Sequence, residues 1–118
     1  MILVDTSVWV NHDRIFDPAL AEIVTNGQLL CHDFIVGELA VGSIKDRKIF
    51  LGKLGQFNKI KKISDEIILE FIETHKLYAT GLSYIDIHLL ASCMLGKCKI
   101  YSLDKKLVEF AKKLGVNY

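Results

Sequence analysis

Short runs of consecutive apolar residues alternate along the chain with longer segments whose apolar residues recur every three or four positions. The short runs are typical of parallel strands buried on both faces, and the longer segments are typical of helices with one apolar face. We predict strands at residues 2–5, 28–32, 59–63 and 99–102, with a final short strand at 116–118. The helical pattern covers residues 6–11, 18–26, 34–44, 46–57, 65–77, 84–95 and 105–114.

Residues that commonly begin and end helices lie at the boundaries of these segments. Asp33 and Ser64 precede helical segments and are good N-caps. Gly27, Gly96 and Gly115 follow helical segments, where a residue in the left-handed conformation usually ends a helix. Strands that alternate with helices predict an α/β fold, a three-layer α/β/α sandwich around a mostly parallel central sheet of four to five strands.

The composition fits a single domain over residues 1–118, with 51% apolar residues available for a core. No apolar run reaches the roughly 18 residues of a membrane span, and no basic leader precedes the first apolar run. The three cysteines are odd in number and form no Cys-x-x-Cys pair, which argues against a disulfide framework or a zinc site. Cys31 and Cys93 fit better as small buried apolar side chains. We therefore expect a cytoplasmic protein with no membrane partner.

Four carboxylates interrupt or close apolar stretches that are far apart in the sequence: Asp5, Glu38, Asp86 and Asp104. An ionised carboxylate is costly to bury alone and persists when it is paired or bound to a cation. Asp5 and Asp104 follow predicted strands, so both should emerge at the carboxyl edge of the sheet, where ligands of open α/β folds bind. We expect the fold to gather all four carboxylates there, as an oxygen-only site that suits Mg²⁺ or Mn²⁺.

Most of these carboxylates also have a purely structural interpretation. Asp5 and Asp104 can each cap the helix that follows, and Asp86 completes a capping-box pattern with Ser83. Glu38 has no such explanation, because it shares a helical face with Phe34 and Val41, which we expect to point inward. The functional interpretation therefore depends on the four residues taken together.

The net charge of +1 hides an excess of basic residues outside these four positions. If a cation neutralises four of the 14 acidic residues, the 15 Lys and Arg outnumber the remaining ten. The basic residues cluster at 45–48, 58–62, 105–106 and 112–113. Such clusters can contact a phosphate backbone, or they can simply be the solvated faces of helices.

Four segments carry a family resemblance: VDTSVWV at 4–10, HDFIVGELAVG at 32–42, YIDIHLLAS at 84–92 and SLDKKL at 102–107. In this order they resemble the signature blocks of PIN-domain ribonucleases, and more narrowly those of the VapC toxins of type II toxin–antitoxin systems. The resemblance extends over almost the whole chain.

This resemblance implies a PIN-like fold and a Mg²⁺-dependent endoribonuclease, with Mn²⁺ able to substitute, that cleaves RNA by metal-activated water and is inhibited by a cognate VapB antitoxin. We also expect a homodimer. Carried over by position, the acidic quartet that would bind metal and act in catalysis is Asp5, Glu38, Asp86 and Asp104. Ser7 and Ser102 match supporting hydroxyl positions; the family more often has Thr at the latter, which keeps the hydroxyl. Asp33 stands where related toxins often carry Pro.

Other classes fit these residues less well. Haloacid-dehalogenase phosphatases require a second acid where this chain has Ser7. Response-regulator receivers require a phosphorylatable Asp after the third strand, where this chain has Ser64 and Asp65, and an acid pair after the first strand, which this chain lacks. A non-catalytic PIN-like module that binds RNA or protein is the remaining alternative, and the presence of all four acids argues against it.

Two further expectations concern residues near the acids. His32 and His88 are not needed as ligands, because Mg²⁺ prefers oxygen. Core or interface packing is the expected role of His88, and His32 is expected either to contact the antitoxin or to satisfy a strand end. An inhibitory peptide should occupy an apolar groove, with a basic side chain reaching the four acids. The helices around Trp9, Phe34 and Phe50 are the expected walls of that groove.

Overall fold

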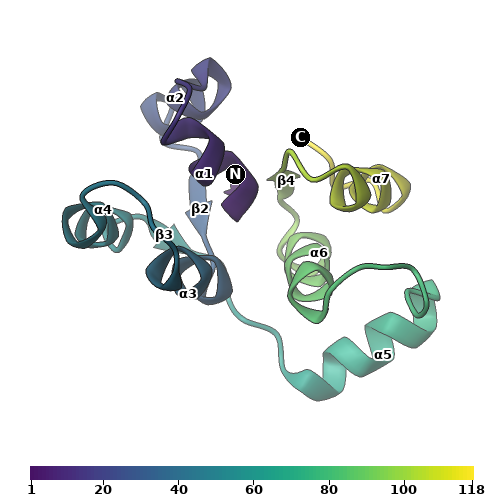
Figure 1. Ribbon diagram of the computed structural model, residues 1–118. Helices are drawn as coiled ribbons and strands as arrows, with labels where there is room; N and C mark the ends of the chain where they lie inside the picture. The colour runs from purple at the N-terminus through teal and green to yellow at the C-terminus, as the bar shows by residue number, and fades with distance from the viewer.

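The computed structural model describes residues 1–118 and contains a four-stranded, all-parallel sheet between helices (Figure 1). The strands are β1 Ile2–Val4, β2 Leu29–Cys31, β3 Asn58–Lys59 and β4 Lys99–Tyr101. The helices are α1 Thr6–His12, α2 Pro18–Thr25, α3 Asp33–Val41, α4 Arg47–Leu54, α5 Asp65–His75, α6 Tyr84–Gly96 and α7 Lys105–Lys113. The predicted α/β class and parallel sheet are confirmed.

The strand order is β3-β2-β1-β4, so the sheet grows in opposite directions from β1. All three residues of β1 are buried, as the continuous apolar run predicted. The boundary between β1 and β4 is the place where the strand order reverses. In open α/β sheets a ligand crevice forms outside the carboxyl ends of the strands at such a place.

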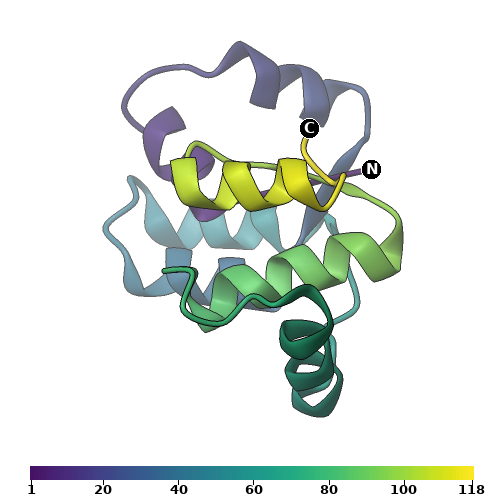
Figure 2. The same ribbon diagram turned by 90° about the vertical axis from the view of Figure 1, so that its right-hand side faces the viewer.

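Helices cover both faces of the sheet. Figure 1 shows α3 and α4 on one side and α6 and α7 on the other, while α5 packs against α6 and extends away from the sheet, as the turned view in Figure 2 also shows. Helix α6 has the most buried residues of any helix, because it lies between the sheet and α5. None of the seven helices combines the length and apolar character needed to cross a membrane.

Two predicted strands are wrong in extent. The strand predicted at 59–63 is observed only at Asn58–Lys59, and residues 116–118 form a single bridge, between Asn117 and Ile100. The alternation in 59–63 has a different cause: Ile60 and Ile63 leave the sheet edge and pack against the core. An alternating pattern records which side chains are buried, not whether the backbone pairs.

Two predicted helix caps are wrong by one residue. His32, not Asp33, is the N-cap of α3, because its Nδ1 accepts the backbone N–H of Phe34 at 3.0 Å. Gly96 is the last residue of α6, and Lys97 takes the left-handed conformation instead. A Cβ at Gly96 would lie 2.9 Å from Ile60 Cδ1, so close packing explains this glycine. The predicted Ser64 cap and the left-handed residues Gly27 and Gly115 are confirmed.

Candidate active site

Asp5 lies directly after β1 and is both a helix cap and the centre of a hydroxyl network. Its buried carboxylate oxygen Oδ2 accepts hydrogen bonds from Ser7 Oγ at 2.7 Å and from Ser102 Oγ at 2.8 Å. The sheet register explains the second contact: Val4 pairs with Tyr101, so the next residues of the two strands are Asp5 and Ser102. Parallel pairing therefore brings together two side chains that are 97 positions apart.

The two serines connect this carboxylate to the segment that begins α7. Ser7 Oγ accepts the N–H of Leu103 at 3.0 Å, and Ser102 Oγ accepts the N–H of Asp104 at 3.0 Å. The two hydroxyl oxygens are 3.3 Å apart. Both serines, predicted as supporting residues, thus hold the end of β1 and the end of β4 in one rigid arrangement.

Asp86 and Asp104 both act as the structural interpretation predicted. Asp104 Oδ1 caps α7 by accepting the N–H groups of Lys106 and Leu107 at 2.9 and 3.1 Å. Asp86 Oδ2 accepts the Ser83 N–H at 3.1 Å and completes a capping box. In each carboxylate only one oxygen is used, so the cap fixes the side chain and leaves the second oxygen free of protein hydrogen bonds.

The pKa of Asp86 responds to two of the other acids. Burial raises this pKa, the hydrogen bonds from Ser83 lower it, and the negative charges of Asp5 and Asp104 raise it further. Asp5 and Asp104 are linked more directly, because Ser102 Oγ donates to Asp5 Oδ2 and accepts the N–H of Asp104. Asp86 is thus connected to this pair through charge, not through a shared hydrogen bond.

Glu38 is tied to the residue that follows Asp5, Thr6, for which the sequence suggested no role. Thr6 Oγ1 donates a hydrogen bond to Glu38 Oε1 at 2.7 Å, and Thr6 is the direct neighbour of Asp5. The expected inward face is only half right, because Phe34 is partly buried but Val41 is 89% exposed. The position of Thr6 between Asp5 and Ser7 was the available signal, but its partner lies 32 residues away.

His32 and His88 belong to a buried aromatic cluster, as core packing predicted for His88, while His32 satisfies the junction between β2 and α3. The His88 ring packs edge-on against Phe34 and Tyr84, with ring centroids 4.8 and 4.7 Å away. Burial lowers the pKa of His32 from 6.5 to about 4, and the neighbouring His88 lowers it further. His32 positions α3, and hence Glu38, through its cap.

The four carboxylates fit a hard divalent cation by their chemistry. None of them forms a salt bridge with Lys or Arg, and each keeps one oxygen without a protein hydrogen bond. No three or more His, Cys, Asp and Glu side chains in the structure are grouped closely enough to hold a metal ion together. Mg²⁺ needs fewer protein ligands, since it usually keeps several waters and takes one or two carboxylates.

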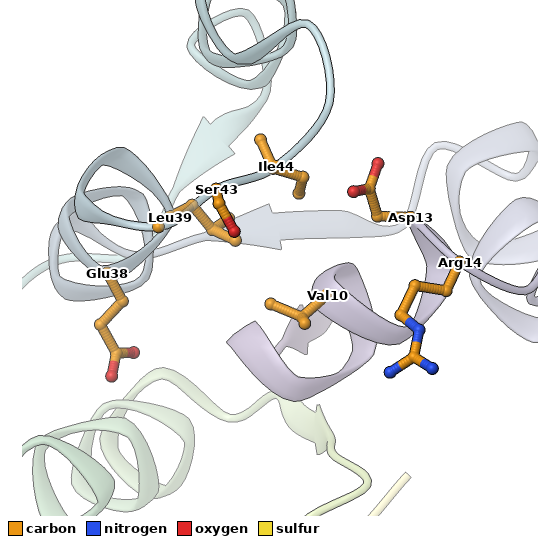
Figure 3. A pocket seen from close by; sticks show the side chains of 8 residues that line it. Val10, Asp13, Arg14, Glu38, Leu39, Ser43 and Ile44 are labelled. Atoms are coloured by element: carbon orange, nitrogen blue, oxygen red, sulfur yellow. The ribbon is translucent and has the colours of Figure 1, made fainter.

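A cavity of about 280 Å³ lies beside Glu38. Figure 3 shows Glu38 at one end, Arg14 at the other, and Val10, Leu39 and Ile44 along its length. The cavity lies between α1, α3 and the segment that follows α3. The helices α1 and α3 were also expected to form the inhibitor groove, but Trp9, Phe34 and Phe50 do not line this cavity, and the Trp9 ring is buried edge-on against Phe50. The place of the groove stays a prediction.

Known proteins share this sequence and architecture. The PIN domain family model matches residues 2–113. The chain is 34% identical to Ribonuclease VapC32 of Mycobacterium tuberculosis, in two strains, over 117 residues that cover 98% of this chain and 94% of the relative. The crystal structure of PAE2754 from Pyrobaculum aerophilum superposes with a TM-score of 0.63 over 97% of this chain and 94% of that one, at 12% identity. At that identity the last comparison supports the fold alone.

Proposed function

The chain belongs to the PIN-domain family and, within it, to the VapC ribonucleases, and on this basis we propose a Mg²⁺-dependent endoribonuclease toxin that a VapB-type antitoxin inhibits. The observation that carries the proposal is the Ser102 link between Asp5 and the start of the helix capped by Asp104, at the place where the strand order reverses. A binding module has no need for neighbouring carboxylates that repel one another, because such repulsion costs stability.

In this proposal the acidic side chains have distinct tasks. Asp5 is the central metal ligand, because Ser7 and Ser102 fix one of its oxygens and leave the other free. Asp86 and Asp104 are held by their caps in the same way, and Glu38 is held by a threonine hydroxyl. When bound, a divalent cation supplies charge that stabilises a pentacovalent phosphate and lowers the pKa of water. Mn²⁺ has the same preference for oxygen and is expected to replace Mg²⁺.

The RNA backbone needs a basic surface beside an acidic site. Lys105 and Lys112 on α7 line a cavity of about 500 Å³ that begins at Ser102 and Leu103. Because Ser102 contacts Asp5 directly, a phosphate next to the cleaved one would reach these lysines. The basic clusters at 105–106 and 112–113 are therefore proposed as RNA contacts, and the identity of the RNA is a matter of surface shape that no motif here encodes.

The cavity beside Glu38 is the proposed place for the antitoxin. Val10, Leu39 and Ile44 give it an apolar part that suits a peptide, and one of its walls is the helix that carries Glu38. An Arg of the peptide matches the planar geometry of carboxylates and would compete with metal for the four acids. Truncating that Arg should weaken inhibition more than binding, because the apolar contacts supply most of the affinity.

The test is RNA cleavage by the purified chain with Mg²⁺, with Mn²⁺ and with EDTA. Cleavage should require the metal, and Asp5→Asn should abolish it while circular dichroism stays unchanged. Asp17→Asn is the matched control, because Asp17 is also a buried N-cap but lies outside the site. Undiminished cleavage in EDTA would refute the metal dependence. RNA binding without any cleavage, under all metals, would favour the non-catalytic module. The expected homodimer stays a prediction that light scattering can test.

A further inference from the structure

Helix α6 ends in a way that places two cysteine side chains together. Lys97 takes the left-handed conformation, and the N–H of Cys98 bonds to the carbonyl of Cys93 at 3.0 Å. This bond between residues five apart is the mark of a Schellman ending, in which the side chains of the two bonded residues are frequently in contact. In α6 those two side chains are the Cys93 and Cys98 thiols.

Three other helices of the same chain end with the same bond and serve as internal comparisons. The backbone pairs are Gln28 to Ile23 in α2, Leu77 to Ile72 in α5 and Val116 to Ala111 in α7. In α5 and α7 both side chains of the pair are apolar, as such an ending usually requires. Only in α6 does the fold place two oxidisable groups at these positions.

The two thiols differ in their surroundings from the third cysteine. Cys93 and Cys98 are 0% and 6% exposed, and both line a cavity of about 320 Å³ together with Lys97 and Lys99. The neighbouring thiol and burial both raise the pKa of Cys93. The neighbouring thiol lowers the pKa of Cys98, burial raises it, and the positive charge of the N-terminus lowers it further. Positive charge and a partner thiol both favour reactivity. Cys31 is buried without a partner thiol, and burial raises its pKa to about 11.

We propose that Cys93 and Cys98 form a reversible redox site at the end of α6, oxidised by a peroxide and reduced by a dithiol. The Cys98 thiolate attacks one oxygen of hydrogen peroxide, the O–O bond breaks, and water leaves after a proton is taken up. The Cys93 sulfur then displaces the hydroxyl of the resulting sulfenic acid as a second water. Two thiols and one peroxide thus give one disulfide and two waters, a two-electron oxidation.

This site is separate from the four carboxylates. Cys98 precedes β4 and therefore lies at the amino ends of the parallel strands, while Asp5 and Ser102 lie at the carboxyl ends. A disulfide would tie the end of α6 to the start of β4. The proposal does not depend on the nuclease function.

The experiment treats the folded, full-length chain with hydrogen peroxide, removes the peroxide, alkylates the remaining thiols in denaturant and maps the tryptic peptides. Trypsin cuts after Lys97, between the two cysteines. A disulfide would therefore keep the dipeptide 98–99 attached to peptide 77–97, and dithiothreitol would release it. We expect two of the three thiols to be lost together while Cys31 remains alkylated.

Matched variants separate the pair from a general loss of thiols. The Cys31→Ala variant should still form the disulfide between Cys93 and Cys98, and the Cys93→Ala variant should give no linked peptide. If Cys93→Ala does not fold, the wild-type peptide map still decides. Loss of Cys31 as fast as Cys98, sulfinic acid without linked peptides, or linkage only after unfolding would each overturn the proposal.

Discussion

The neutral form of His32 is expected to make the stability of this protein depend on pH between about 4 and 6.5. Its side chain is completely buried, and Nδ1 accepts the Phe34 N–H that begins α3. A protonated Nδ1 cannot accept that bond. The groups around it are His88 and Lys62, which lower its pKa, and Asp33, which raises it.

The size of the effect follows from the pKa of His32, which burial lowers from 6.5 to about 4. Above pH 6.5 the side chain is neutral in both the folded and the unfolded chain, so it contributes no pH dependence. As the pH falls below 6.5 the unfolded chain binds a proton that the folded chain does not bind, and stability decreases. Below about 4 both states bind it, and the loss stops. At roughly 1.4 kcal/mol per pH unit the total loss is about 3 kcal/mol.

Urea unfolding at a series of pH values measures this directly in the wild type and in His32→Asn. Asparagine is a good N-cap, so the variant keeps an acceptor for α3 but cannot titrate. Its smaller side chain costs stability equally at every pH. The free energy of unfolding should therefore fall less steeply below pH 6.5 in the variant, by about 3 kcal/mol in total. His75→Asn, at the end of α5, controls for loss of an imidazole.

An equal pH dependence in the wild type and His32→Asn would refute this reasoning, because all other titrating groups are shared. A steeper dependence in the variant would also refute it. The same outcome in His75→Asn as in His32→Asn would show that the effect does not belong to the buried cap.

Further predictions concern the acidic site and the packing of α6. Asp86→Asn should raise the urea midpoint of the metal-free protein at neutral pH, because burial and two like charges raise the Asp86 pKa; the gain should shrink as the pH falls and the wild-type side chain becomes protonated. Thr6→Val should cost about 1 kcal/mol and lower RNA cleavage on the order of tenfold by freeing Glu38, whereas Thr6→Ser should keep both near wild type. A nuclease assay in which Thr6→Val is fully active would exclude that role. In Gly96→Ala the new Cβ should displace Ile60 Cδ1, so this change alone should not stabilise the protein. In an Ile60→Val background, which lacks that methyl group, the same change should stabilise it by about 0.5–1 kcal/mol, as measured in a double-mutant cycle.

Much of the fold could be predicted because its evidence is local. The apolar run at the start of the chain and the apolar periodicity of α6 are properties of neighbouring residues, and both elements lie where they were predicted. The acids were recognisable for the same reason, since a carboxylate at the end of an apolar run is visible in one short segment. The caps show the limit of this approach: two polar residues, His32 and Asp33, stand side by side at the start of α3, and sequence chemistry favoured the wrong one.

The pairing of these segments was decided by the tertiary structure alone. Ser102 meets Asp5 because β4 pairs with β1 in one particular register, and a shift by one residue would turn the serine to the other face. Thr6 meets Glu38 because α1 packs on α3. The sequence by itself thus determined which elements form and which residues could do chemistry, since those depend on the nearest few positions. Which distant side chains touch depends on strand order, register and helix packing, and these are set by the burial of the whole core at once.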